Sequence, residues 1–516
     1  MGAYLTKEPH ISVNLFIDEE KNKVLFVQAQ KDFMDVLLSF LTFPMGTIAR
    51  LVSKNSNIQK VRVGSISSLY DSVVNLEEKQ FWTPVCKEML LRPRNTMEEY
   101  CEHIKLNIDD TEKMKYFVCE DWNCSRKSGA LLSTFRNQKC RCGKPMNREI
   151  FHESSSTDRN VDFDGFVPET ASFIISDDLS VKPDTCHGTI FKPLNLPESR
   201  DLDAIKQVTI NVTQRDEIQL QENLDSRYQG FYILDLLKCS LFSMTPLTDV
   251  FLRKNLATEN RITQSVTSFD SGTSDLKSKS RERKITVKLL VRKSSNTVLF
   301  ALGGEDFADF IISLLTFPLG GVENMLNGNS YMGSIDNLYQ SISVLDRSKY
   351  LRSSYVMDML LKTPLAHHFK ISNQMLPIDE VSAVGYACDS KKNYGEVVSG
   401  SLVSSNGGSY STNLRSCIHL EYLEPQSSIG EAYNNYGGRG FTKKPSLYMV
   451  TDDLVVTPGS STSAITVLTK LRIPLSDVME CSINIGQNEC LSILKASLIS
   501  SSALTNGLSQ FLTKFT

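Results

Sequence analysis

The residues best suited to chemistry are four cysteines in the amino-terminal half: Cys119, Cys124, Cys140 and Cys142. Four thiolates within so short a stretch match the tetrahedral ligand set that Zn²⁺ prefers, and Gly143 permits a tight turn after the last of them. A site filled by four thiolates leaves no open position for water. The cluster therefore predicts a structural zinc ion, with four unrelated buried thiols as the alternative, because the spacing is less regular than two Cys-x2-Cys pairs.

Basic side chains surround this cluster, and seven of them oppose only Glu120 and Asp121 between residues 119 and 148. Because Trp122 and Phe135 lie among them, the segment could bind a nucleic-acid backbone and stack bases. The alternative, which we favour, is a solvated rim that offsets the negative charge of a four-thiolate zinc site. The seven residues are Arg126, Lys127, Arg136, Lys139, Arg141, Lys144 and Arg148.

Two acidic pairs, Asp177-Asp178 and Asp452-Asp453, are candidates for binding a divalent cation or for acid–base catalysis. Each pair follows an apolar strand and precedes another short one, a setting that is more typical of a polar turn. No histidine, lysine or third carboxylate recurs beside both pairs. We therefore expect polar turns, with a metal-dependent hydrolase as the less favoured alternative.

Two further motifs resemble functional sites, but the sequence favours a structural role for both. His367-His368 has no counterpart elsewhere in the chain, and neither a cysteine nor an aspartate recurs close to it. Residues 436–440 resemble a glycine-rich phosphate loop but lack the preceding strand and following helix that such a loop requires. We expect an ordinary histidine pair and a flexible loop. Because no nucleophile, base and orienting group recur together, no catalytic residues are predicted.

The elements that must position these residues occur twice. Residues 11–46 and 285–320 align without a gap, and 16 of the 36 pairs are identical. Each run opens with two alternating apolar segments, which predict a β-hairpin, followed by the apolar stripe of an amphipathic helix. Asp32 and Asp306 stand where an N-cap belongs, with Asp35 and Asp309 favouring the helix start. A Thr-Phe-Pro-x-Gly sequence then ends both helices.

Further motifs repeat in the same order along both halves. Gly64-Ser65-Ile66 matches Gly333-Ser334-Ile335, where the serine is expected to cap a short helix. Near the two ends, residues 237–241 and 494–498 share the pattern Leu-Lys-x-Ser-Leu. The fold class is therefore α+β with two tandem copies of one domain, each burying its own core, and a zinc-ribbon-like insertion in the first copy alone.

The predicted boundaries follow from composition. Residues 1–10 form an amino-terminal leader, 11–255 the first copy, 256–284 a polar linker and 285–516 the second copy. A loop at residues 389–413, rich in Ser, Gly and Asn, takes the place of the cysteine cluster in the second copy.

The composition of the 516 residues is that of an ordinary globular protein, with a formal charge of −3. The apolar stretches are shorter than the roughly 18 to 20 residues that cross a bilayer, so no membrane span is predicted. The amino terminus lacks a secretory signal, and the twelve cysteines are unevenly spread. We therefore expect an intracellular protein, cytoplasmic or nuclear.

Several motifs, in this order, resemble the plant proteins grouped as domain-of-unknown-function family 674. They are Val-Leu-Phe, Asp-Phe-x-Asp, Thr-Phe-Pro-x-Gly, Gly-Ser-Ile-x-x-Leu-Tyr, Cys-x-Cys-Gly-Lys-Pro-Met and Asp-Asp-Leu. The resemblance covers nearly the whole chain and implies a plant source and tandem copies, but no catalytic residues. Together with the closed cysteine site, it favours a non-enzymatic interaction or scaffold protein with unknown protein partners. Nucleic-acid binding through the basic rim is the alternative.

Overall fold

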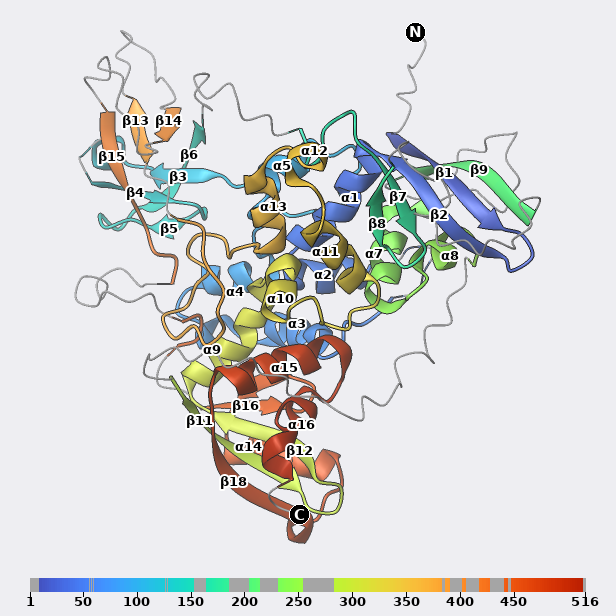
Figure 1. Cartoon of the computed structure of the whole chain (residues 1–516). Coiled ribbons are helices and arrows are strands. Elements are labelled where there is room, and N and C mark those ends of the chain that lie inside the picture. Colours follow the sequence, from blue (N-terminus) through green and yellow to red (C-terminus); the bar gives the residue numbers. More distant parts are fainter. Residues whose placement is uncertain are drawn as a thin grey trace, which may run out of the picture.

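A computed structural model of the chain describes residues 9–54, 56, 58, 60–125, 127, 129–152, 164–184, 204–213, 231–253, 283–382, 386–389, 401–404, 417–426, 440–443 and 447–513. Helices fill the centre of the molecule, with one sheet to the right, a second sheet below and a third at the upper left (Figure 1). Among the described residues, no helix combines the length and the apolar character that crossing a bilayer requires. The predicted linker, apart from residues 283 and 284, and the leader before residue 9 lie outside these residues.

The first half, residues 9–253, contributes one sheet and most of the blue and green helices of Figure 1. Its sheet strands are β1 (His10–Asp18), β2 (Lys23–Gln30), β7 (Ser172–Ser176), β8 (Val181–Pro183), β9 (Ile205–Thr213) and β10 (Phe231–Tyr232). Its helices are α1 (Lys31–Thr42), α2 (Met45–Val52), α3 (Ile66–Asn75), η1 (Glu78–Gln80), α4 (Pro84–Leu91), α5 (Glu98–Glu102), α6 (Trp122–Ser125), α7 (Ile233–Phe242) and α8 (Pro246–Phe251).

The second half, residues 283–513, contributes the lower sheet and the yellow to red helices. Its sheet strands are β11 (Ile285–Arg292), β12 (Thr297–Gly303), β16 (Tyr448–Thr451), β17 (Val456–Pro458) and β18 (Val478–Ile485). Its helices are α9 (Glu305–Ser313), η5 (Leu314–Thr316), α10 (Leu319–Met325), α11 (Ile335–Ser343), α12 (Arg347–Tyr350), α13 (Ser354–Leu361), α14 (Ser461–Lys470), η6 (Leu475–Asp477), α15 (Gln487–Ile499), α16 (Ala503–Gly507) and α17 (Ser509–Leu512).

The two sheets have the same strand order. The order β9-β1-β2-β7-β8 in the first half corresponds to β18-β11-β12-β16-β17 in the second, and β10 extends the first sheet by one strand. Both predicted hairpins are present, and each has a register shift at the matching position, after Phe16 and after Leu290. The predicted helices follow directly and end before the prolines.

The start of these helices differs from the prediction. Gln30 and Gly304 occupy the N-cap positions, so Asp32 and Asp306 lie inside the first turn. The next aspartates are buried rather than exposed at the helix start. Asp35 and Asp309 instead bind a glycine-containing loop, which the pattern of residues in the helix does not predict.

Asp35 and Asp309 each accept two backbone hydrogen bonds from such a loop. Asp35 Oδ1 accepts from the N–H groups of Phe166 and Val167 at 2.8 and 3.0 Å. Asp309 Oδ1 accepts from those of Phe441 and Thr442 at 3.0 and 2.8 Å. The preceding residue is Gly165 or Gly440 because a Cβ there would overlap the carboxylate. Gly440, the last residue of the predicted flexible loop, therefore has a structural role; residues 436–439 of that loop lie outside the described residues.

The halves do not bury separate cores, because one hydrophobic cluster runs through both. The segments after the first helices meet in a short antiparallel bridge between Pro44 and Pro318. The N–H of Met45 donates to the carbonyl of Phe317 at 2.9 Å, and that of Leu319 donates to Phe43 at 3.0 Å. The contact has the same form in both directions, which indicates an approximate twofold relation between the halves.

The Gly-Ser-Ile motifs carry this relation further. Neither Ser65 nor Ser334 caps its own helix through its side chain. Instead, Ser65 donates through its N–H to Ser497 O at 2.9 Å and through Oγ to Ser500 O at 2.6 Å, at the end of α15 in the other half. Ser334 makes the corresponding bonds to Ser240 O and Ser243 O at the end of α7. Each Gly-Ser-Ile motif thus docks on the Leu-Lys-x-Ser-Leu motif of the opposite half.

The third sheet is built from both halves and closes on itself. Its strands are β3 (Tyr116–Cys119), β4 (Ala130–Ser133), β5 (Gln138–Lys139), β6 (Pro145–His152), β13 (Tyr386–Asp389), β14 (Ser401–Ser404) and β15 (Cys417–Tyr422). Strands β15 and β4 pair in parallel, as do β14 and β6, so six strands form a ring with β5 added to β6. The cysteine segment is therefore part of a shared barrel rather than an insertion. The loop predicted at 389–413 includes strand β14; residues 390–400 and 405–416 lie outside the described residues.

A buried carboxyl in α10 predicts an unusual pH dependence. Glu323 is fully buried, and burial raises its pKa from 4.5 to about 8. Only its Oε1 is paired, with Ser330 Oγ at 2.5 Å. Between these pKa values the folded protein holds a proton that the unfolded chain has released, so stability falls as the pH rises, by up to about 1.4 kcal/mol per pH unit.

Replacing Glu323 by Gln should flatten this part of the profile, because the amide cannot titrate. The free energy of unfolding, measured by denaturant between pH 5 and pH 8.5, provides the test. The same change at exposed Glu20 should leave the slope as it is. An equal slope in wild type and E323Q would show that Glu323 does not retain its proton.

Candidate metal centre

The four cysteines come from three short elements at one end of the barrel. Cys119 ends strand β3, and Cys124 lies in the single turn of α6. Cys140 and Cys142 lie in the tight turn between β5 and β6, which closes through hydrogen bonds from Cys140 N to Lys144 O and from Gly143 N to Cys140 O. Gly143 has φ 87°, a conformation that favours glycine, so the expected tight turn is confirmed.

The four sulfur atoms converge on one point. Their Sγ atoms all lie within 4.8 Å of one another, with Cys119 to Cys142 at 3.4 Å and Cys124 to Cys140 at 3.6 Å. All four are free thiols; Cys119 and Cys140 are buried, whereas Cys142 is exposed. The buried pair packs against Phe117, Leu131 and Met146 in a small separate cluster. The arrangement could hold a metal ion.

The surroundings of the thiols differ. The backbone N–H of Lys144 lowers the pKa of Cys142 to about 7, whereas burial raises the pKa of Cys124 to about 11. Burial also holds the pKa of Cys119 well above its usual value. Because thiolates are the metal ligands, binding of an ion must displace protons from this cluster.

The comparisons with known proteins assign the chain to a family. A family model described as "Protein of unknown function (DUF674)" matches residues 7–488. The chain belongs to the DUF674 family. No curated protein and no solved structure matches it. The resemblance seen in the sequence is thereby confirmed, whereas the plant source that it implies stays a prediction.

The aromatic side chains beside the DUF674 cysteine cluster are covered by arginines. The guanidinium of Arg148 lies 4.3 Å from the ring centroid of Trp122, and that of Arg94 lies 4.5 Å from Phe135, which is itself buried. One face of each ring is therefore covered within the protein, which weakens the base-stacking alternative. Sequence spacing offers no signal for Arg94, because it comes from a loop distant in the chain.

Several basic residues of the predicted rim form ion pairs. Arg141 pairs with Glu421 on β15 of the second half at 2.8 Å, and Lys144 pairs with Asp121 at 2.9 Å. Asp121 also accepts hydrogen bonds from the N–H groups of Asn123 and Cys124, which orders the turn that carries this cysteine. The rim thus ties the cysteine turns together and to the other half. Arg126 lies outside the described residues.

The two acidic pairs lie in tight turns at matching positions. Asp177 accepts hydrogen bonds from the N–H and Oγ1 of Thr248 in α8 at 2.8 and 2.7 Å, and Asp452 does the same for Thr505 in α16 at 2.7 and 2.8 Å. Leu179 and Leu454, which follow the pairs, are buried with φ near 61° and 63°. The first aspartate of each pair therefore holds the start of a short helix.

The Asp177 contact predicts an effect on stability. Asp177→Ala should lower the free energy of unfolding by about 2 kcal/mol, because it removes a cap and leaves buried Thr248 with fewer partners. Asp178→Ala is the matched control: Asp178 accepts one bond from Ser180 N, so about 0.5 kcal/mol is expected. Chemical denaturation compares the two variants. Equal losses would contradict the capping role.

The histidine pair packs at the junction of barrel and helices. His368 Nδ1 lies 3.2 Å from Glu424 Oε2, and both imidazole rings pack edge-on against Tyr422. Burial lowers the pKa of His367 to about 4. In the described part of the chain, no group of three or more possible metal ligands includes this pair. Its position agrees with the structural reading.

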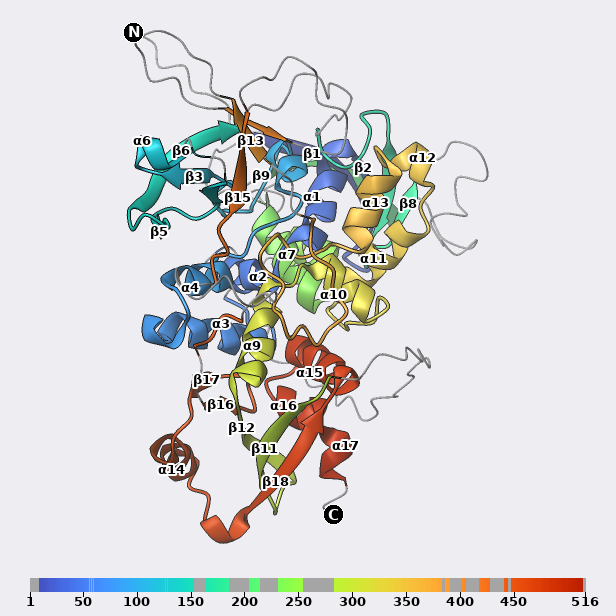
Figure 2. The same ribbon diagram turned by 90° about the vertical axis from the view of Figure 1, so that its left-hand side faces the viewer.

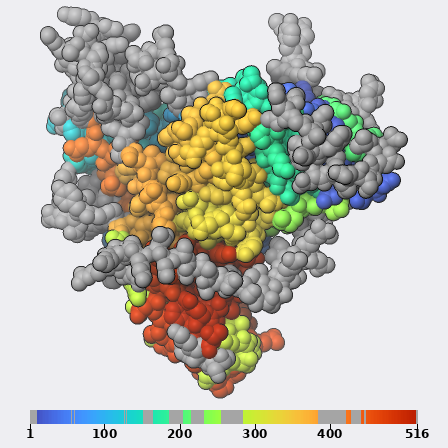
Figure 3. All heavy atoms as spheres, viewed as in Figure 1, coloured from blue at the N-terminus to red at the C-terminus, as the bar shows by residue number. Residues whose placement is uncertain are grey.

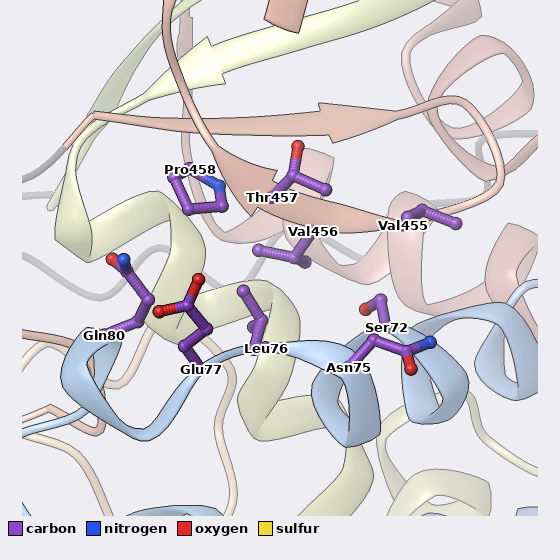
Figure 4. Close-up of a pocket in the computed structure, with 9 residues that line it drawn as sticks. All are labelled: Ser72, Asn75, Leu76, Glu77, Gln80, Val455, Val456, Thr457 and Pro458. Carbon is purple, nitrogen blue, oxygen red and sulfur yellow. The ribbon is translucent and has the colours of Figure 1, made fainter.

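Two pockets lie elsewhere on the molecule. One, of about 180 Å³, lies between α3 with the following loop and the edge strand β17 (Figure 4). Its only ionisable side chain is Glu77. The other, of about 110 Å³, is polar and includes Asn95, Glu98 and Asp109. Neither pocket is lined by the cysteine cluster or by the acidic pairs.

Proposed function

We propose that this DUF674 chain is a non-enzymatic, intracellular interaction or scaffold protein in which Cys119, Cys124, Cys140 and Cys142 hold a structural zinc ion. The convergence of the four Sγ atoms within 4.8 Å carries the proposal. Sulfurs bound to one tetrahedral zinc ion at 2.3 Å lie about 3.8 Å apart. The separations of 3.4 and 3.6 Å are close to this value without forming disulfides.

A structural role follows from the ligand count and the setting. Four thiolates complete the coordination of zinc, so no position remains for a catalytic water. The cluster joins the ends of β3 and β6 and the α6 turn, where the local apolar core is small. Metal binding would supply the folding free energy that this core lacks.

An interaction role is supported by what surrounds the candidate catalytic groups. Asp177 and Asp452 are engaged by threonines, and neither of the two described pockets contains a candidate aspartate or the cysteine cluster. The barrel assembled from both halves and the eight-residue edge strand β18 offer surface for partners instead. Nucleic-acid binding is the less favoured candidate: Arg136 and Lys139 of the rim are exposed, but Arg141 and Lys144 are engaged in ion pairs within the protein.

The matching contacts also support the proposal that the halves are tandem copies of one domain. The equal strand order, the paired bulges and the reciprocal Gly-Ser-Ile contacts are what duplication of a domain that pairs with itself would produce. If the two copies packed separately, the contacts between the halves would not be expected to match.

Metal analysis of the purified full chain tests the zinc proposal. One zinc per chain is expected in the wild type, and less than a tenth of that in C119S/C142S. Cys481→Ser, at a partly exposed cysteine on β18, is the control and should keep its zinc. A wild-type chain that lacks zinc after expression and purification with added zinc would overturn the proposal.

Affinity capture with the full chain tests the interaction role. Partners that bind equally to wild type and to Asp178→Ala would agree with a non-enzymatic role. A measured turnover that is abolished by changing Asp177 or Asp178 would overturn it.

A further inference from the structure

Exposed apolar side chains gather at one end of the second half. Nine large apolar residues are highly exposed in the described part of the chain, and three of them lie between residues 465 and 475. These are Ile465, Leu471 and Leu475, with 63, 51 and 77% of their surface exposed. Leu447, 49% exposed, lies against Gly459 just before the same helix. Isolated exposed leucines are ordinary, but such a concentration marks an interaction surface.

This segment forms an apex of the molecule. Helix α14 stands away from the main body, and the turn that joins it to β18 is the lowest point of the chain in Figure 2. In the space-filling view the red carboxy-terminal part likewise tapers to this lower end (Figure 3).

The apex is nevertheless firmly attached. Leu468 of α14 and Ile473 of the following turn are buried against Leu299, Phe300 and Met449 on the outer face of the lower sheet. Asp477 then anchors the end of the turn through Arg292 at 2.8 Å and Ser294 at 2.7 Å. The exposed side chains are therefore held outward by a packed base, and no element of the described chain covers them.

Two cations flank the central leucine. Lys470 and Arg472 stand on either side of Leu471, both are exposed, and neither takes part in an ion pair among the described residues. Residues 461–476 contain no acidic residue. Arg472 has φ 54°, which makes a sharp turn at the apex. Apolar tips between unpaired cations complement a surface that is anionic outside and apolar beneath.

We propose that this apex, defined by Ile465, Lys470, Leu471, Arg472 and Leu475, docks the protein on the surface of an anionic lipid bilayer. The leucines and Ile465 enter the boundary between headgroups and acyl chains, while the two cations stay among the lipid phosphates. A stable protein interface involves about 20 to 30 residues on each partner, whereas the apex is defined by five. The binding is peripheral and reversible, because few apolar side chains are inserted.

Vesicle flotation with the full chain tests the proposal. Binding is expected to vesicles of phosphatidylcholine with about one third phosphatidylserine and to be much weaker with phosphatidylcholine alone, since each cation near an anionic surface contributes about fivefold. L471D and L475D should each weaken binding by about tenfold or more, because an inserted leucine is replaced by a charge. K470E/R472E should remove the preference for the anionic lipid.

Val344→Asp is the matched control, because Val344 is 82% exposed but lies alone at the end of α11. It should bind like the wild type, and circular dichroism should show that all variants are folded. Absence of binding to anionic vesicles at low salt would overturn the proposal, as would equal binding by L475D and wild type. A cross-link from position 475 to a protein partner, without vesicle binding, would assign the apex to a protein instead.

Discussion

Replacing Gly64 or Gly333 by alanine should destabilise the protein by about 3 kcal/mol or more, although neither glycine is near a candidate site. An added Cβ would lie 2.4 Å from Ser497 O at Gly64 and 2.6 Å from Ser240 O at Gly333. Both residues also have positive φ, 40° and 54°, which costs alanine a further 1 to 2 kcal/mol or so. Backbone on both sides of each contact leaves nothing flexible to move aside.

Denaturant unfolding of the two variants measures this loss. Gly304→Ala is the control, because a Cβ there meets nothing within 4 Å and its φ is −74°. We expect the control to unfold within about 0.5 kcal/mol of the wild type. Since the two contacts are reciprocal, G64A and G333A should be similar to each other. A G64A chain as stable as G304A would contradict the docking of α3 on α15.

Removing the proposed zinc ion is expected to have the other large effect, and a local one. Chelation of this ion, or Cys119→Ser, should increase hydrogen exchange of β3, β4 and β6 amides at least about 100-fold, because only Phe117, Leu131 and Met146 are buried with the thiols in their cluster. The effect should reach β14 and β15, which pair with β6 and β4. The sheet around β1 and β2 has its own large core and should keep its protection.

Hydrogen exchange with mass spectrometry resolves these strands separately. Cys481→Ser is the control: its barrel amides should stay protected when the zinc is bound and should lose protection only after chelation. Barrel amides that exchange at the same rate with and without the metal would show that the ion does not stabilise the barrel.

Patterns of nearby residues predicted the local elements correctly. The alternating segments, the apolar stripes and the proline stops led to both hairpins and both first helices, because these depend on residues a few positions apart. The spacing of the four cysteines predicted their convergence for the same reason, since turns bring them together. Asp32 is not an N-cap because the helix begins one residue before it, after Gln30. Ser65 occupies the predicted N-cap position, but its hydroxyl donates to Ser500 of the other half instead of accepting from its own helix.

The amino-acid sequence is enough to identify the motifs: two Gly-Ser-Ile motifs, two Leu-Lys-x-Ser-Leu motifs and one cysteine cluster. Only the tertiary structure decided that each Gly-Ser-Ile motif meets the Leu-Lys-x-Ser-Leu motif of the other half, and that the cysteine strands complete a barrel with strands beyond residue 386. Because the motifs are nearly identical, pairing within a half and pairing between halves make the same local contacts. Local contacts therefore do not decide between the two pairings. Burial over the whole chain decides, because pairing between the halves joins them in one continuous hydrophobic core.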